Sequence, residues 1–206
     1  MSGNTSECHL HDEMEPFTYF YYLIFLTGFI GSSFALWAFT HKERNQQCLS
    51  VYLANLLTAD FLLTLTLPVK IIVDLGIAPW SLRIFHCQVT ACFIYLNTYL
   101  SIIFLGFVSA ERCLQLARSS RLSRLQEPAF ARMLCAVAWA MLLLITVPNT
   151  AIPIKRIPER PGVGCIDFKT KLGRDWHVFT NLVCAAIFLT FSAVPLVSNA
   201  LAARRL

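Results

Sequence analysis

The sequence predicts an all-α membrane protein with one domain. Of its 206 residues, 56% are hydrophobic and 14% are charged, and the mean hydropathy is +0.59. Soluble globular proteins carry about 25% charged residues, so this chain is unusually poor in charge. Five apolar stretches are as long as the ~20 residues that a helix needs to cross a ~30 Å bilayer core. A buried helix of a soluble protein can mimic one such stretch, but five in one chain indicate spans surrounded by membrane lipid.

Each span is placed by the distribution of charge along the chain. Four of the five stretches contain no charged residue, the third of them up to Ala110, and the second stretch contains only Asp60, Lys70 and Asp74. The connectors are short, as antiparallel helices in a bundle require. We expect an extracellular segment at 1–16, followed by spans at about 17–40, 49–75, 87–112, 133–154 and 179–203.

The orientation is predicted from the flanks of the first span. Residues 1–16 contain four acids and no Lys or Arg, the reverse of a cleaved signal peptide, whereas Lys42 and Arg44 follow the span. Counting all loops gives nine bases on one side of the membrane and eight on the other, which does not decide the orientation. The residues that flank the first span usually have the largest influence on orientation. The sequon that starts at Asn4 agrees. We therefore expect a retained signal anchor, an extracellular N-terminus and a glycan on Asn4.

Polar landmarks occur in a fixed order along the spans. An acid lies inside the second span in NLLTADFLLTLTLP, and an acid–base pair ends the third span. At that depth charged side chains reach the lipid headgroups, so a membrane anchor is the simplest interpretation of the pair. The landmarks are Leu56, Asp60, Cys87, Glu111, Arg112, Trp139 and Cys165.

This ordered set resembles the rhodopsin-like G-protein-coupled receptors. The segments FHCQVTACFIYLNTYLSIIFLGF, TVPN and GRDWHVFTNLVCAAIF further resemble the purinergic nucleotide-receptor branch, over about residues 16–206. The resemblance implies a rhodopsin-like helical bundle with five of the seven transmembrane helices present. Three positions depart from the family pattern: Ser32 replaces a usual Asn, Cys113 replaces a usual Tyr, and no Tyr follows Pro195.

The resemblance implies a plasma-membrane receptor, and not an enzyme, that activates a heterotrimeric G protein of the inhibitory type. Arg112 would contact the G protein, and Glu111 would hold Arg112 in an ion pair at rest. Asp60 would lie in a sodium- and water-filled cavity, although a plain interhelical hydrogen bond is the alternative for this residue. Without helices six and seven, we expect residues 1–206 to insert without signalling alone, and to be able to associate with full-length receptor.

The resemblance also implies a disulfide between Cys87 and Cys165. Both residues would be extracellular, where disulfides persist. The bond is worth ~4 kcal/mol in the chain-entropy model, and it would hold the second outer loop over the mouth of the bundle. An N-terminal Cys of the nucleotide branch pairs with the third outer loop, so the partner of Cys8 stays open.

A ligand pocket is expected in the outer half of the bundle, under the second outer loop. Residues 155–175 hold six bases and three acids, which favours an anionic ligand such as a nucleotide. Gly164 stands where the nucleotide branch has Lys, which leaves an acidic or neutral peptide open as well. Tyr95 and Tyr99 are one helical turn apart and face the same side. The positions that match ligand contacts of the branch are Arg83, Tyr95, Tyr99, Asn149, His177 and Asn181.

Two other classes of membrane protein remain to be weighed. A multi-pass transporter or channel subunit would explain the spans and Asp60, but no second charge near mid-bilayer pairs with Asp60 and no inverted repeat is visible. An intramembrane enzyme would need a nucleophile or a metal set, and neither His-Glu-x-x-His nor Gly-x-Ser-x-Gly occurs. We expect no cofactor, no protein-bound metal cluster and no nucleic-acid partner.

Overall fold

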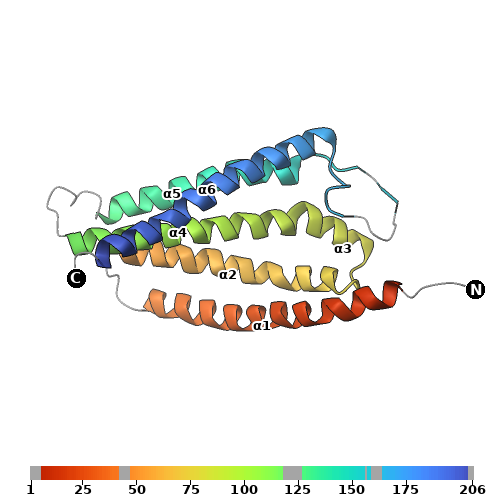
Figure 1. Ribbon diagram of the computed structural model, residues 1–206, viewed down its shortest axis with the longest axis horizontal. Helices are drawn as coiled ribbons and strands as arrows, with labels where there is room; N and C mark the ends of the chain where they lie inside the picture. Colours follow the sequence, from red (N-terminus) through yellow and green to blue (C-terminus); the bar gives the residue numbers. More distant parts are fainter. Residues whose placement is uncertain (1–5, 42–46, 118–126, 156, 159–163, 204–206) are drawn as a thin grey trace, which may run out of the picture.

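The computed structural model is a bundle of helices that run up and down along its long axis (Figure 1). It describes residues 6–41, 47–117, 127–155, 157–158 and 164–203. Five helices in this part of the chain are long and apolar enough to cross a bilayer, which confirms the predicted all-α membrane fold. The elements are α1 (Ser6–His41), α2 (Cys48–Asp74), α3 (Trp80–Phe85), the π-helical turn η1 (His86–Thr90), α4 (Ala91–Ala117), α5 (Pro128–Ala151) and α6 (Lys171–Ala203).

Three of the long helices begin before the predicted spans, at the end of the bundle where α6 begins, which is the predicted outer end. Helix α1 begins at Ser6 and α6 at Lys171, and the third long helix begins at Trp80 as α3, continuous through η1 with α4. Hydropathy marks only the part of a helix that lies in hydrocarbon, whereas the backbone hydrogen bonds continue into the headgroup region. The connector between α2 and α3 is therefore much shorter than expected.

Gly76 makes this short connector possible. Its φ of 73° is the left-handed conformation that ends many helices, and its amide donates to the carbonyl of Val73 at 3.0 Å. The Nη2 of Arg83 in α3 donates to the carbonyl of Gly76 at 3.1 Å. The start of the third long helix is thus tied to the end of α2.

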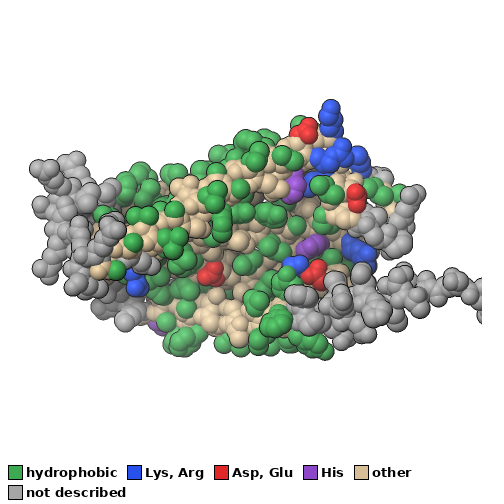
Figure 2. All heavy atoms as spheres, in the orientation of Figure 1, with side chains coloured by type: hydrophobic (Ala, Val, Ile, Leu, Met, Phe, Trp, Pro, Cys, Tyr) green, Lys and Arg blue, Asp and Glu red, His purple; other side chains and the backbone are tan. Residues whose placement is uncertain are grey.

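Helix α4 is the centre of the bundle and packs against α2, α5 and α6, while α1 packs against α2. Leu100, Ile103 and Phe104 of α4 are fully buried. Figure 2 shows hydrophobic side chains along the flanks of the bundle, with most of the visible charged side chains gathered at the end where α6 begins. This distribution suits a bundle whose flanks face lipid and whose ends face water.

Two glycines let neighbouring helices approach closely. A Cβ on Gly106 of α4 would lie 2.8 Å from a ring carbon of Phe191 in α6, and a Cβ on Gly28 of α1 would lie 2.7 Å from the methyl of Thr64 in α2. Small residues serve this purpose in membrane bundles, where packing drives helix association. The ring of Phe191 also meets Phe107 edge-on, with centroids 5.6 Å apart.

Candidate functional site

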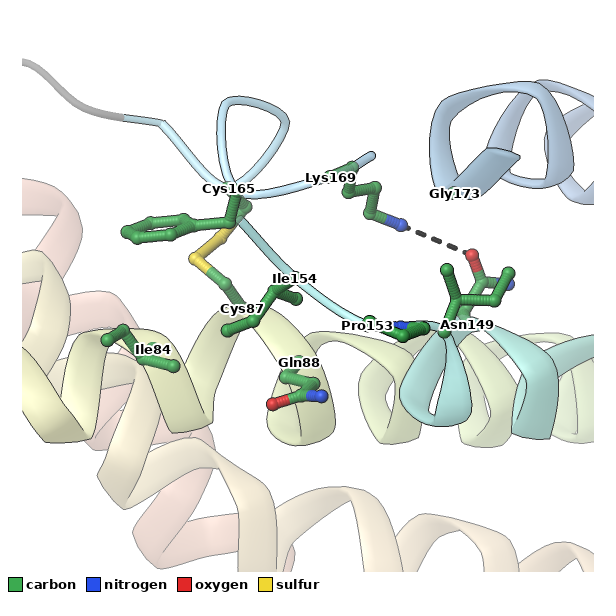
Figure 3. Close-up of a pocket in the computed structure, with 11 residues that line it drawn as sticks. Ile84, Cys87, Gln88, Asn149, Pro153, Ile154, Cys165, Lys169 and Gly173 are labelled. Atoms are coloured by element: carbon green, nitrogen blue, oxygen red, sulfur yellow. Dashed lines mark hydrogen bonds between the residues drawn. A yellow bond between two sulfur atoms is a disulfide. The ribbon is translucent and has the colours of Figure 1, made fainter. Parts of the chain in front are cut away.

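The segment between α5 and α6, the predicted second outer loop, is tied at Cys165 to the start of the third long helix. Cys165 of this loop forms a disulfide with Cys87 of η1, as Figure 3 shows. The loop folds back on itself through an isolated antiparallel bridge between Ile154 and Lys169. Phe168 is 3% exposed and packs against Trp80 of α3, with ring centroids 5.4 Å apart. One covalent bond and one aromatic contact therefore hold the loop over the bundle.

Beneath this loop lies a cavity of about 390 Å³ between α4, α5 and α6. Its size is in the range of ligand sites. Four of the six predicted ligand residues line it, namely Tyr95, Asn149, His177 and Asn181. The rings of Tyr95 and His177 meet edge-on at 6.3 Å, and Asn181 Nδ2 lies 3.5 Å from His177 Nε2. The structure thus brings together side chains from three helices.

Lys169 is a lining residue that the sequence did not single out. Its Nζ donates to Asn149 Oδ1 at 3.2 Å (Figure 3), and Asn149 Nδ2 donates to Thr180 Oγ1 at 3.1 Å. Burial lowers the pKa of Lys169 below its ordinary value, because the charged form loses solvation. An anion in the cavity would oppose that shift. In the sequence, Lys169 was only one of the six bases of residues 155–175.

Tyr99 and Arg83 lie outside this cavity. Tyr99 stacks on Tyr95, with ring centroids 6.1 Å apart and planes inclined by 26°. Arg83 lines a second cavity of about 280 Å³ on the side of α2 and α3. Cys87 and Cys165 line both cavities, so their disulfide is part of the wall between them. The predicted ligand residues are therefore divided by the loop.

Deeper in the bundle, Asp60 of α2 is half-buried and accepts a hydrogen bond from Ser101 Oγ of α4 at 2.6 Å. The interhelical bond considered for Asp60 is therefore present. Asn97, one turn before Ser101, is fully buried, and its Oδ1 has no partner in the described part of the chain. Carboxylate, hydroxyl and amide oxygens are the donors that a hard cation prefers. Asp60 and Ser101, with Asn97 one helical turn away, thus offer oxygen atoms of the kind that a sodium ion binds.

At the inner end of α4, Glu111 and Arg112 have different environments. Glu111 is 4% exposed and accepts a hydrogen bond from Gln115 Nε2 at 3.1 Å, whereas Arg112 is exposed. The expected ion pair between them is absent among the described residues. Successive residues on a helix do not face each other, whereas residues four apart do. Gln115 therefore takes the place expected for Arg112.

Some predictions lie outside the described residues. They concern the glycan on Asn4 and the bases Lys42 and Arg44 that follow the first span. Trp139 of α5, one of the landmarks, is described, and its Nε1 donates to Asn55 Oδ1 of α2 at 3.1 Å.

Comparison with known proteins adds to this geometry. Residues 31–206 match the family model of the 7 transmembrane receptor (rhodopsin family). Over 206 residues, the whole chain, the identity to G-protein coupled receptor 171 is 63% for the Mus musculus protein and 61% for the Homo sapiens protein. Identity to purinoceptor 13 of Homo sapiens is 35% over 185 residues, which are 90% of this chain and 52% of that protein. The chain spans 65% of the length of the first two relatives.

Proposed function

Because the chain belongs to the rhodopsin family of seven-transmembrane receptors, we propose that it acts in a G-protein-coupled receptor with a ligand site in the outer cavity between α4, α5 and α6. The observation that carries this proposal is the convergence of Tyr95, Asn149, His177 and Asn181 on one cavity beneath a loop fixed by a disulfide. Receptor sites for small ligands combine apolar walls with a few convergent polar groups, as this cavity does. The receptor is proposed to lie in the plasma membrane with its N-terminus extracellular.

The ligand is proposed to be anionic, either a nucleotide or a peptide with an acid group. Lys169 supports this proposal, because its ammonium group lies at the cavity and is paired there with the neutral Asn149. A phosphate or carboxylate would supply the charge that Asn149 lacks. The polar side chains of His177, Asn181 and Thr180 could then orient the rest of the ligand. The names of the purinoceptor relatives agree with a nucleotide, whereas the Gly at position 164 leaves the peptide open.

The G-protein contact is proposed at the inner end of α4, with a heterotrimeric protein of the inhibitory class as partner. Arg112 is exposed there, so its guanidinium is available to a partner without breaking an internal ion pair. Glu111 is buried beside it and bonded to Gln115. Release of this carboxylate would change the surface that Arg112 presents.

Asp60, Ser101 and Asn97 are proposed to hold a sodium ion with water. The short bond between Asp60 and Ser101 and the unpartnered Oδ1 of Asn97 support this proposal. Bound sodium would supply a positive charge between α2 and α4. That charge would stabilise the carboxylate of Asp60 inside the bundle.

Residues 1–206 expressed by themselves are proposed to insert into the membrane without signalling, and to be able to associate with full-length receptor. Tyr95 is 40% exposed and Asp60 is half-buried. The polar sides of α2 and α4 are therefore not fully covered by the described helices. Polar groups that face hydrocarbon are unfavourable, and further helices would cover them.

The test is a screen of nucleotides and acidic peptides against full-length receptor in cells, read as inhibition of cyclic-nucleotide synthesis. A ligand found this way should lose at least tenfold in potency in Lys169→Gln. Lys171→Gln is the matched control, because Lys171 is an exposed base two residues away. Equal potency in both variants would remove Lys169 and its cavity from the proposed site.

A further inference from the structure

The second outer cavity is formed by the ends of α2 and α3, by η1 and by the second outer loop. Its volume is about 280 Å³, near the lower end for ligand sites. Two aromatic side chains and three ionisable ones line it, and Gly164 adds no side chain of its own. Apart from the disulfide, the lining residues that matter below are Asp74, Trp80, Arg83, His86, Gly164 and Phe168.

Two hydrogen-bonding atoms beside this cavity are buried and unsatisfied. His86 is 9% exposed, and its Nδ1 has no partner in the described part of the chain. The same holds for Nε of Arg83, whose Nη2 is bonded to the Gly76 carbonyl. A guanidinium only donates, and an imidazole donates from Nδ1 in one of its tautomers. Buried donors of this kind are rare without an acceptor. The cavity therefore offers two unpaired donors to a ligand that carries a hydrogen-bond acceptor.

The balance of charge favours a single negative charge. Asp74 is neutralised by Lys70, whose Nζ lies 2.8 Å from its Oδ2 and 4.8 Å from the ring centroid of Tyr21. In the loop, Asp167 Oδ2 accepts the amide of Gly164 at 2.8 Å. Asp74 lines the same cavity as Arg83 but is paired with Lys70, and Arg83 forms no ion pair within the described part of the chain.

We propose that this cavity binds a small carboxylate anion through Arg83 and His86, at a site separate from the ligand cavity between α4, α5 and α6. The forked guanidinium matches the two oxygens of a carboxylate. The rings of Trp80 and Phe168, 5.4 Å apart, supply an apolar wall for a short hydrocarbon tail. One net positive charge suits a monoanion better than a phosphate dianion. The site does not depend on the identity of the receptor's ligand.

The test uses purified receptor in lipid nanodiscs and sodium butyrate as the probe, with sodium chloride and sodium sulfate at equal ionic strength. Butyrate should raise the unfolding temperature with saturation, because a ligand that binds the folded state stabilises it. The rise should vanish in Arg83→Gln and persist in Arg174→Gln, an exposed base at the outer start of α6. A rise of equal size with chloride, a larger rise with sulfate, or an unchanged rise in Arg83→Gln would overturn the proposal.

A direct measurement covers the case in which Arg83→Gln does not fold. Line broadening of ¹³C-labelled butyrate by the receptor should weaken at least threefold in His86→Leu, which keeps Arg83 and its bond to the α2 connector. Broadening that is unchanged in His86→Leu would refute the role of that residue. Lys169→Gln should leave the broadening intact, and its loss there would show that butyrate binds the other cavity. Failure of Lys169→Gln to affect the receptor's own ligand would contradict only the proposed function.

Discussion

Substituting Gly106 by Ala should destabilise the bundle although alanine is the better helix former. The new Cβ would lie 2.8 Å from Cδ1 of Phe191, closer than side chains approach each other in proteins. The Phe191 carbonyl oxygen and Cβ would lie at ordinary contact distances of 3.5 and 3.6 Å from the same atom, so the ring carbon is what must move. Helices α4 and α6 must therefore separate slightly, or the ring must leave its edge-on contact with Phe107.

The magnitude follows from two opposing terms. Overpacking of a well-filled contact costs about 1–3 kcal/mol, and the greater helix propensity of Ala returns up to about 1 kcal/mol. With a net loss of about 1–2 kcal/mol, the unfolding temperature of a chain of this size should fall by roughly 2–8 °C. A thiol-reactive fluorescent dye can follow unfolding, because Cys48, Cys135 and Cys184 are buried free cysteines.

Gly31→Ala is the matched control. A Cβ at Gly31 meets nothing within 4 Å, so this variant should unfold at the wild-type temperature or above it. The double variant Gly106→Ala/Phe191→Leu should be more stable than the sum of its two single variants predicts, because the shorter side chain removes the clash. An unchanged unfolding temperature in Gly106→Ala, or an equal fall in Gly31→Ala, would refute the close approach of α4 and α6.

Three further predictions concern the disulfide, the inner switch and the orientation. Cys87→Ser and Cys165→Ser should each lower the unfolding temperature; the chain-entropy model gives an upper limit of about 4.5 kcal/mol for a separation of 78 residues, and an unchanged temperature would count against a stabilising bond. Arg112→Ala in full-length receptor should abolish G-protein activation while leaving ligand affinity within about twofold, as measured by radioligand binding; normal signalling would leave Arg112 a membrane anchor. Glycosidase should increase electrophoretic mobility through Asn4, and an epitope after Lys42 should be inaccessible on intact cells; the opposite results would invert the topology.

The family and the number of spans could be predicted from the sequence, because the bilayer imposes long apolar runs and the landmarks keep their order. The match of residues 31–206 to the rhodopsin family confirms that resemblance. Helix ends could not be predicted in the same way. The first helix begins at Ser6, well before the apolar run, because a helix continues wherever its backbone bonds can form.

The site was only partly predictable, because part of it depends on a folded loop. The resemblance to the nucleotide branch implied ligand contacts at Tyr95, Asn149, His177 and Asn181, and the structure places these residues around one cavity. Lys169 joins them only because the loop is held by its disulfide and its short bridge. Sequence order could not show that Arg83 lies on the other side of that loop.

The different environments of the adjacent residues Glu111 and Arg112 could not be predicted from the sequence either. Glu111 and Arg112 are neighbours in sequence, and the resemblance implied that they form an ion pair. Their side chains point in different directions, so one is buried and the other exposed. The partner of a helical carboxylate is better sought four residues away, where Gln115 lies.

The disulfide that separates the two outer cavities gives their two proposed ligands a shared wall. Cys87 and Cys165 line both, so a displacement of this bond that widens one cavity narrows the other. If binding of either proposed ligand displaces this wall, it would change the free energy of binding of the other ligand. Such coupling is reciprocal: the factor by which a ligand in one cavity changes the affinity for the second ligand equals the factor by which the second changes the affinity for the first. Reduction of the disulfide would therefore alter the cooperativity between the two cavities as well as the affinity of each cavity for its ligand.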